Sequence, residues 1–261
     1  MLEELTALYD GYVDTYRDAD GKLPSMMQLK RTHTAFVVRN AELIADGEGF
    51  APEVREAALA AALLHDTGRY EQLKVYNTFK DADSVDHAVF SHQIVLERNW
   101  LADLPPERAD AIAKAVLYHN RRAIPEDLSA DDPKTRLLFL AAHTVRDADK
   151  LDIFRVLEDQ VKNCDWKSDS RAFWNLAVSA APSPAVVESI EHRRPVAYQE
   201  IRTLADFVLI QVGWMIGELH FATSRRLCRE RGHLAFRRDF LHQLTDDAAV
   251  DRLCDLAEDA L

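Results

Sequence analysis

Apolar residues recur every three or four positions through long stretches of this chain, and few residues that break a helix separate them. Only 8 Gly and 9 Pro occur among 261 residues, of which 48% are hydrophobic. Spacing of this kind places apolar side chains on one face of a helix, and a chain of this length can enclose a substantial core. We therefore predict an all-α protein rather than one built from short strands.

Several of the predicted helices carry a histidine or an aspartate on their apolar face or at its end. In chain order these residues are His33, His65, Asp66, His87, His119 and Asp149. Imidazole nitrogen and carboxylate oxygen suit Mn, Fe, Co, Ni or Zn, and the absence of cysteine from the set argues against a structural zinc site. Burying such groups without compensation would be costly. We predict that His33, His65, Asp66 and Asp149 share a cation; the alternative is a buried network of ion pairs.

The adjacent pair His65 and Asp66 carries a geometric requirement. Their side chains diverge by about 100° on an ideal helix, so both can reach one ion only where the helix ends or is distorted. Gly68 is predicted to provide that end. Residues 69–83 have no helical period and are predicted to form a connecting loop over the site. Ser84 is predicted to cap the following helix.

Prolines mark the start of two of these helices. Pro52 and Pro106 lie in the first turns of helices that are predicted to end at His65 and His119. Proline is tolerated there because backbone N–H groups in the first turn of a helix have no acceptor within the helix, so the N–H that proline lacks is not needed. A later, long helix is expected to carry Asp149 on its apolar face.

The order of these residues resembles the HD superfamily of metal-dependent phosphohydrolases, which is named for a doublet found here in Leu63-Leu-His-Asp-Thr-Gly-Arg69. The resemblance covers about residues 25–160. It implies a core of about five helices, with additional N-terminal and C-terminal helices packed on it. The other matching pieces are Lys30-Arg-Thr-His-Thr, Val85-Asp-His-Ala, Val116-Leu-Tyr-His-Asn and Arg146-Asp-Ala-Asp-Lys-Leu-Asp.

The resemblance implies that all six residues bind metal. One ion would be held by His33, His65, Asp66 and Asp149, and a second, bridged by Asp66, would be completed by His87 and His119. The alternative for His87 and His119, with one ion, is to bind the substrate phosphate or to pack in the wall of the site. The expected cofactor is therefore a divalent transition metal, Mn, Fe, Co, Ni or Zn, as one or two ions, with Mg as a further candidate.

The activity that the resemblance implies is hydrolysis of a phosphate ester, and we expect a nucleotide or another small phosphate ester as the substrate. The mechanistic hypothesis is attack by metal-bound hydroxide, formed because the ion lowers the pKa of water from about 15.7 toward 7. Asp66 and Arg69 are the predicted catalytic residues, and the predicted substrate-binding residues are Arg69, Asn120, Arg121 and Lys150. A salt bridge is the alternative role for Arg69, and a solvated helix end is the alternative for Arg121.

Two other functions stay open at this point. A di-iron oxygenase of the same fold would use the same six ligands, and a nucleotide-sensing module would bind its ligand without turnover. Iron content and oxygen uptake identify the first, and the absence of product identifies the second. The Gly-Tyr-Pro signature of the cyclic-di-GMP phosphodiesterase branch is missing after His119, where Asn120-Arg-Arg follows, so that substrate is disfavoured.

Charge, cysteine content and hydropathy indicate which classes of partner and which cellular compartment to expect. Lys and Arg total 32 against 44 for Asp and Glu, a formal net charge of -12, so no long nucleic acid is expected as a partner. The 3 cysteines show no paired spacing and fit a reducing compartment, and the acidic N-terminus lacks the pattern of a signal peptide. The most apolar segment, residues 204–217, is shorter than the roughly 20 residues of a membrane span. We expect a cytoplasmic protein with no membrane partner, and the sequence is compatible with a homo-oligomer.

The domain organisation expected from these patterns is a single helical unit over residues 1–261. Within it, residues 25–160 are expected to form the HD-type metal-binding core, and residues 161–261 an accessory helical lobe. The sequence of this lobe indicates no function of its own.

Overall fold

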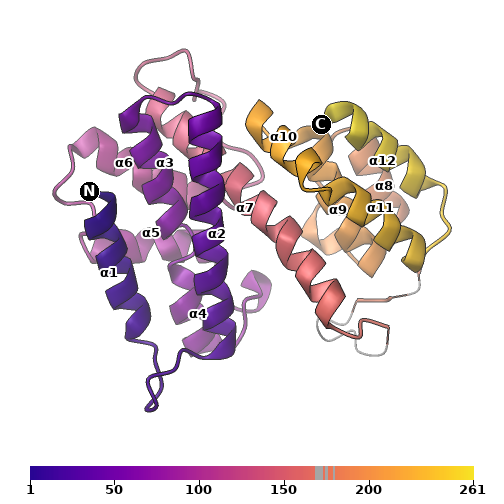
Figure 1. Cartoon of the computed structure of the whole chain (residues 1–261), viewed down its shortest axis with the longest axis horizontal. Coiled ribbons are helices and arrows are strands. Elements are labelled where there is room, and N and C mark those ends of the chain that lie inside the picture. The colour runs from indigo at the N-terminus through magenta and orange to yellow at the C-terminus, as the bar shows by residue number, and fades with distance from the viewer. Residues whose placement is uncertain (168–172, 174–175, 179) are drawn as a thin grey trace. The chain divides into compact units, whose positions relative to one another are not determined.

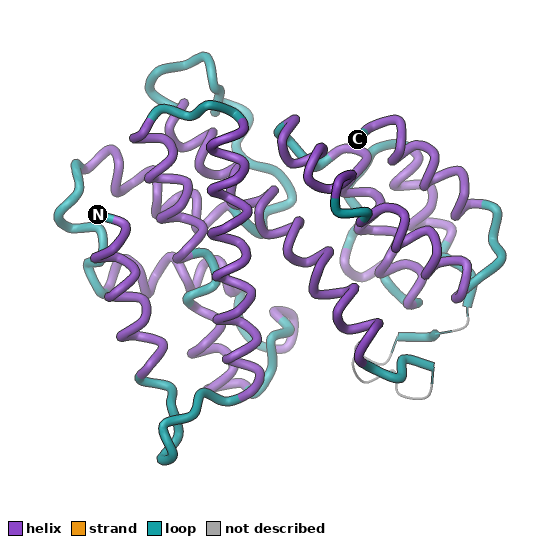
Figure 2. The backbone as a smooth tube through the Cα atoms, viewed as in Figure 1, coloured by secondary structure: helices purple, strands orange, loops and turns teal. Residues whose placement is uncertain are grey.

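The computed structural model of the chain describes residues 1–167, 173, 176–178 and 180–261. Within these ranges the regular elements are helices (Figure 1, Figure 2). Extended residues pair there only in an isolated bridge between Ala177 and Thr203. The all-α prediction is therefore confirmed, with helices before and after the predicted core.

The described residues form two compact units, Met1–Asp149 and Lys150–Leu261. The division falls inside the long helix α7 (Arg136–Asn163), earlier in the chain than the boundary near residue 160 that the sequence indicated. All predicted site residues except Lys150 lie in the first unit. In the part of the chain that the structure describes, no helix has both the length and the apolar character needed to cross a lipid bilayer.

The first unit contains six helices in addition to the first part of α7. Their bounds are Leu2–Asp14 (α1), Ser25–Gly47 (α2), Pro52–Leu64 (α3), Gly68–Tyr76 (α4), His87–Glu97 (α5) and Pro106–Tyr118 (α6), with a short 3-10 helix at Asp81–Asp83 (η1). The helix starts predicted at Pro52 and Pro106 are confirmed.

Helix α3 forms the centre of the first unit. Each residue from Ala57 to Leu64 is buried, and α1, α2 and α6 all pack against this helix. Most of these residues are alanines, whose small side chains let neighbouring helices approach closely. Because His65 and Asp66 directly follow this buried run, their side chains emerge inside the unit, where both are buried.

The prediction of a loop at residues 69–83 is wrong for the first half of this range, which belongs to α4 (Gly68–Tyr76). The segment has no apolar period because few of its residues are buried. Tertiary contacts stabilise it instead: the Tyr70 hydroxyl lies 2.8 Å from the Tyr9 hydroxyl of α1, and α4 packs against α5. A helix this short depends on such packing, since helix propensity alone is marginal at this length.

The cap predicted for the next helix is also wrong. Helix α5 begins at His87, and the carboxylate of Asp86 accepts hydrogen bonds from the backbone N–H groups of Ala88 and Val89. The Ser84 hydroxyl donates to a backbone carbonyl of the preceding turn instead. An aspartate is as good a cap as a serine, and its position places His87 in the first turn of α5.

Among its described residues, the second unit contains the remainder of α7 and five further α-helices. Their bounds are Pro184–Glu191 (α8), Leu204–Gly217 (α9), Ala222–Glu230 (α10), His233–Leu244 (α11) and Ala249–Ala260 (α12), with a short 3-10 helix at Tyr198–Glu200 (η3). Helix α9 is the most apolar segment of the sequence and is largely buried. It packs against α8, α11 and α12, so it belongs to the core of this unit.

A buried ion network lies in this core. The Arg237 side chain is fully buried, and its guanidinium donates to Glu158 at 3.1 Å, to Gln211 at 2.7 Å and to the Phe154 carbonyl at 3.0 Å. His233 Nδ1 lies 2.5 Å from the same Glu158 oxygen. A buried charge is tolerated only when it is paired and hydrogen-bonded, and Arg237 meets both conditions.

Candidate metal centre

The doublet of His65 and Asp66 lies in a turn between two helices. Helix α3 ends at Leu64 and α4 begins at Gly68. The turn is tightened by a hydrogen bond from the Thr67 N–H to the Leu64 carbonyl at 3.2 Å. The helix end that the sequence required at the doublet is therefore present, and the two adjacent side chains can face one region.

Gly68 does not have the role that was predicted for it. It is the first residue of α4 and does not adopt the left-handed conformation of a helix-ending glycine. A Cβ atom added to Gly68 would lie 2.7 Å from the backbone nitrogen of Ser91 and 2.9 Å from the carbonyl oxygen of His87. The Gly68 N–H donates to the Ser91 hydroxyl at 2.8 Å. The glycine therefore lets the doublet turn pack directly on the first turn of α5.

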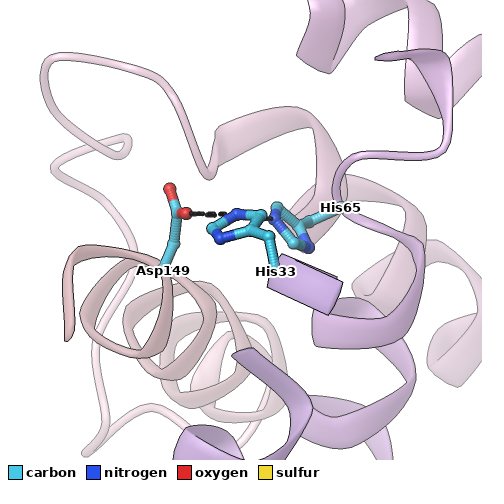
Figure 3. Close-up of side chains that lie close together, drawn as sticks. All are labelled: His33, His65 and Asp149. Carbon is cyan, nitrogen blue, oxygen red and sulfur yellow. Dashed lines mark hydrogen bonds and ion pairs between the residues drawn. The ribbon is translucent and has the colours of Figure 1, made fainter. Parts of the chain in front are cut away.

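The side chains of His33, His65 and Asp149 converge on one side of the doublet (Figure 3). We call His33, His65, Asp149 and the Oδ2 atom of Asp66 the first donor group. His33 Nε2 lies 3.1 Å from Asp149 Oδ1 and 3.4 Å from His65 Nε2. Asp66 Oδ2 lies 3.6 Å from both of these Nε2 atoms. Ligands about 2.1 Å from a tetrahedral ion are about 3.4 Å apart, so the group fits a transition-metal ion.

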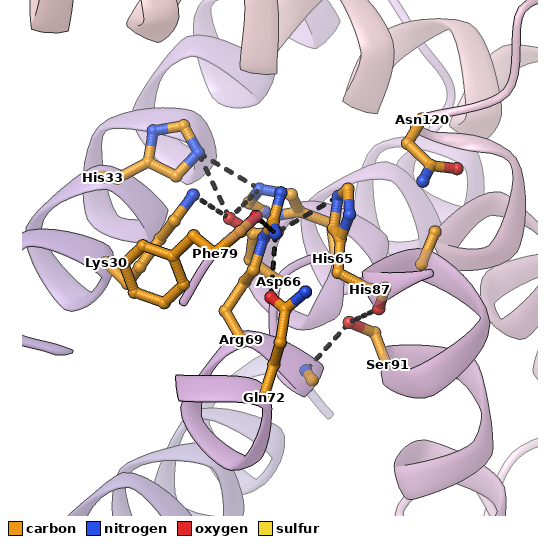
Figure 4. Close-up of polar contacts among 12 residues, drawn as sticks. Lys30, His33, His65, Asp66, Arg69, Gln72, Phe79, His87, Ser91 and Asn120 are labelled. Carbon is orange, nitrogen blue, oxygen red and sulfur yellow. Dashed lines mark hydrogen bonds and ion pairs between the residues drawn. The ribbon is translucent and has the colours of Figure 1, made fainter. Parts of the chain in front are cut away.

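The other oxygen of Asp66 faces a second cluster (Figure 4). His87 Nε2 and His119 Nε2 lie 3.0 Å apart. Asp66 Oδ1 lies 3.7 Å from His87 Nε2 and 3.9 Å from His119 Nε2. We call Asp66 Oδ1, His87 Nε2 and His119 Nε2 the second donor group. One carboxylate thus gives an oxygen to each group, which is the arrangement that a pair of bridged ions needs.

Hydrogen bonds at the far ring nitrogen orient three of the histidines. Nδ1 of His65 and Nδ1 of His119 each donate to the backbone carbonyl three residues earlier, at 2.7 Å in both cases. Nδ1 of His87 lies 2.5 Å from Asp81 Oδ2. Because carbonyl and carboxylate oxygens only accept, Nδ1 carries the proton and Nε2 faces the donor group. The lone pairs of His87 and His119 therefore repel each other unless a proton or a metal ion lies between them.

Burial and neighbouring charges produce the protonation states that metal ligands need. Burial lowers the pKa of His65, and it lowers the pKa of His119 well below the ordinary value. Burial alone would raise the pKa of Asp66, but nearby positive charges, above all that of Lys30, outweigh it and hold this pKa well below its usual range. The pKa of Asp149 is also lowered, because imidazole neighbours outweigh burial. At neutral pH His65 and His119 are neutral and both carboxylates are ionised, as metal binding requires.

Arg69 lies beside Asp66, but protein groups already bind much of its side chain. Its Nη1 donates to Asp81 Oδ1 at 2.9 Å and to the Phe79 carbonyl at 2.6 Å. Its Nε lies 3.4 Å from Asp66 Oδ1 and is buried without a hydrogen-bond partner. The salt-bridge alternative for Arg69 is therefore present in the structure, and one N–H group next to the doublet is left over.

Asp81 is a site residue that the sequence analysis did not single out. It contacts both Arg69 and the Nδ1 atom of His87. Burial alone would raise its pKa, but the hydrogen bond and charge of His87 lower it to about 2. A carboxylate in this position fixes the orientation of the imidazole ring. The sequence signal for it is weak, because Asp81 lies in a turn outside any apolar period.

The other predicted substrate-binding residues also contact protein groups. Asn120 Nδ2 donates to Asp86 Oδ1 at 3.1 Å, and Arg121 Nη1 lies 3.0 Å from Asp86 Oδ2. Asn120 Oδ1 is buried and has no hydrogen-bond partner. Lys150 Nζ lies 3.4 Å from Glu218 Oε2 within the second unit. The structure thus places Asn120 and Arg121 at the capped start of α5, and the substrate-binding role of all three residues stays a prediction.

Two basic residues outside the predicted set contact the doublet and the turn at His119. Lys30, one helical turn before His33 on α2, places its ammonium group 2.7 Å from Asp66 Oδ2. Arg146 Nη1 lies 3.4 Å from the His119 carbonyl and also donates to carbonyls on either side of it. Arg146 therefore holds the end of α6. Each is part of a motif, but only the folded chain reveals which group it meets.

Comparison with known proteins identifies the domain that holds both donor groups. Residues 31–153 match the family model of the HD domain, and this range contains all six predicted metal ligands. No curated protein and no solved structure matches the chain. HD domains define a superfamily of metal-dependent phosphohydrolases, and the His and Asp groups of this chain could hold metal ions. Residues 31–153 of the chain therefore form an HD domain.

Proposed function

We propose that this protein is a metal-dependent phosphohydrolase that acts on a nucleotide or another small phosphate ester. The observation that carries the proposal is the position of Asp66, whose two oxygens face different donor groups. A carboxylate shared in this way is what a two-ion hydrolytic centre requires. The match to the HD domain supports the same assignment.

Each donor group has the composition of a transition-metal site. The first would hold one ion through His33, His65, Asp66 and Asp149, and the second would hold another through Asp66, His87 and His119. The number of imidazoles favours Mn, Fe, Co, Ni or Zn over Mg, which prefers oxygen ligands. When bound, such ions supply Lewis-acid stabilisation of phosphoryl oxygens and lower the pKa of water.

Two buried atoms without a hydrogen-bond partner support a role for Arg69 and Asn120 in binding the substrate. Arg69 Nε is a buried donor beside Asp66, and Asn120 Oδ1 is a buried acceptor on the residue that follows His119. Buried polar atoms without a partner are uncommon in folded proteins, and a bound ligand would satisfy both. In this proposal Arg69 binds a phosphoryl oxygen, and Asn120 accepts a hydrogen bond from a hydroxyl or amino group of the substrate.

The local charge suits an anionic substrate although the whole chain carries a formal charge of -12. Lys30 and Arg69 flank the two oxygens of Asp66. Two divalent ions would add more positive charge than the carboxylates of Asp66 and Asp149 remove. A phosphate group is therefore attracted to this site, while the acidic remainder of the protein disfavours a long nucleic acid.

The test is a phosphatase screen on protein purified without chelator, together with elemental analysis of its metal content. We expect saturable release of phosphate from nucleotides or small phosphate esters with Mn²⁺, Co²⁺ or Ni²⁺. Asp66→Ala should lower this activity at least about 100-fold while the far-ultraviolet circular dichroism spectrum is unchanged. Asp110→Ala is the matched control, because Asp110 is exposed and pairs with Lys114 on its own helix; it should retain full activity.

Two outcomes would contradict the proposal. Tight nucleotide binding without product across all metals would identify a sensing module. Oxygen uptake by iron-loaded protein, without release of phosphate, would identify an oxygenase that uses the same six ligands.

A further inference from the structure

The ammonium group of Lys30 lies 2.7 Å from Asp66 Oδ2, the oxygen that belongs to the first donor group (Figure 4). The Lys30 side chain is 19% exposed, whereas the Asp66 side chain is 3% exposed. Lys30 is therefore partly exposed, whereas the carboxylate that it contacts is buried. It lies on α2 one turn before His33 and one residue before the range that matches the HD domain.

A metal ion in the first donor group and the Lys30 ammonium group would share one oxygen. The ammonium group is a compact cation at hydrogen-bond distance from Oδ2, and Asp66 Oδ2 also lies 3.6 Å from each of two histidine nitrogens of the group. Like charges at this separation repel each other strongly when they are partly buried. Binding of an ion should therefore weaken the contact between Lys30 and Asp66.

An aromatic ring lies near the ammonium group of Lys30. Its Nζ atom lies 5.6 Å from the centre of the Phe79 ring, and the Arg69 guanidinium lies 5.8 Å from the same ring. An aromatic ring attracts a cation without neutralising it. The flexible four-carbon stem of lysine allows the ammonium group to move while the rest of the side chain stays in place. Lys30 can therefore remain near the doublet as a free positive charge.

We propose that Lys30 binds the substrate phosphate, and that Asp66 holds its ammonium group until a metal ion occupies the first donor group. The ion then takes over the charge of Asp66, and Lys30 is released toward the phosphate. With Arg69 at the other oxygen of Asp66, the phosphate would be flanked by two basic side chains. The inference rests on the proposed phosphohydrolase function, since it assigns Lys30 to the same site.

The first part of the test measures metal binding without substrate. Isothermal titration of metal-free protein with Mn²⁺ should show at least about tenfold tighter binding for Lys30→Met than for wild type, because the competing cation is gone. Lys30→Arg keeps the charge and should stay within about threefold of wild type. Lys114→Met is the matched control, because Lys114 pairs with Asp110; it should leave the affinity unchanged.

The second part measures binding of inorganic phosphate to the Mn²⁺-loaded proteins. Lys30→Met should weaken phosphate binding at least about tenfold, and Lys30→Arg should restore most of it. Thermal melting of each variant confirms that it folds. An unchanged or weaker affinity for Mn²⁺ in Lys30→Met, or an unchanged affinity for phosphate, overturns the proposal. Neither part measures turnover, so a wild-type protein without phosphatase activity would refute the proposed function while these affinities still decide the role of Lys30.

Discussion

Each unit of the molecule buries a cluster of charged side chains, but the two clusters are built in opposite ways. In the second unit donors meet acceptors, because the Arg237 guanidinium faces Glu158, Gln211 and a backbone carbonyl. In the first unit Lys30 and Arg69 also meet a carboxylate, but the acceptor atoms His87 Nε2 and His119 Nε2 face each other at 3.0 Å. Burial is similar in both clusters. A cluster in which every hydrogen-bond acceptor meets a hydrogen-bond donor is therefore a structural ion network, whereas a cluster with facing acceptors suits a cation.

This difference predicts how each unit depends on metal. The Arg237 cluster finds the partners for its charge within the chain, so the stability of the second unit should not respond to metal ions. The donor groups around Asp66 would hold an ion only in the folded chain, so the first unit should gain stability when Mn²⁺ binds. The sequence alone left a buried ion network open as an alternative for the first unit. Ion pairs of Lys30 and Arg69 with Asp66 are present there, but they do not account for the facing nitrogens of His87 and His119.

Loss of Arg237 should give the largest change in stability. Arg237→Met leaves Glu158 buried without its cation, which costs about 3–5 kcal/mol of unfolding free energy. Urea denaturation followed by circular dichroism measures the loss, which should be equal with and without Mn²⁺. Arg226→Met is the control, because Arg226 is exposed, and it should change stability by less than about 0.5 kcal/mol. If Mn²⁺ restored the unfolding free energy lost in Arg237→Met, the claim that the Arg237 cluster is independent of metal would be wrong.

Addition of Mn²⁺ should produce the next largest effect. At free concentrations 100 to 1,000 times the dissociation constant, one bound ion stabilises the folded state by about 2.7–4.1 kcal/mol. The same denaturation experiment, with chelated protein as the reference, measures this gain. Asp66→Ala should lose most of it, because both donor groups include Asp66. An equal gain in that variant would mean that the ion binds elsewhere.

Gly68→Ala should have a smaller effect that is confined to the first unit. The added methyl group meets the backbone of α5 at 2.7 Å, and overpacking of this kind costs about 1–3 kcal/mol. Calorimetry should also show weaker binding of Mn²⁺, because the displaced turn of α5 carries His87. Gly11→Ala is the matched control: no atom lies within 4 Å of the added carbon, and this helix position should gain about 0.5–1 kcal/mol. Equal stability of the two variants would show that α5 can move away without cost.

Acidification should destabilise the metal-free protein. The pKa values of His65 and His119 are lowered by burial, so the unfolded chain binds protons near pH 6.5 that the folded chain does not bind. Stability is therefore highest above this pH and falls as the pH drops through it, by up to about 1.4 kcal/mol per pH unit for each histidine. The lowered pKa of Asp66 acts in the same direction at lower pH, near the ordinary value of an aspartate.

Urea denaturation of metal-free protein at several pH values between 7.5 and 5 measures this slope. His119→Gln should reduce it, whereas replacement of the exposed His242 by glutamine should not. A slope that is unchanged in His119→Gln would mean that this ring is not held neutral in the folded chain.

Much of the site could be predicted from the sequence, because the helices that carry it have apolar faces. Helices α3 and α6 begin at predicted prolines, and His65 and His119 follow their last residues. In such helices a polar residue on the apolar stripe stands out, which is why all six residues of the two donor groups were found. Their roles as metal ligands stay a prediction until an ion is observed.

The parts that were missed depend on partners far away in the sequence. Helix α4 has no apolar stripe and is stabilised by contacts with α1 and α5. Lys30 meets Asp66 across 36 positions of the chain, and no local pattern marks this pairing. The sequence predicts that Gly68 ends a helix, but the structure shows that a glycine is needed there because α5 packs too closely for a side chain. Charge pairs and close backbone contacts are properties of the folded chain, so periodicity does not reveal them.

Anomalous diffraction at the manganese edge, from crystals grown with Mn²⁺, tests the central claim most directly. We expect one peak among His33, His65, Asp66 and Asp149 and a second among Asp66, His87 and His119, with Asp66 bound to both. Well-ordered side chains at these positions with no peak between them, in crystals that contain Mn²⁺ elsewhere, would contradict it.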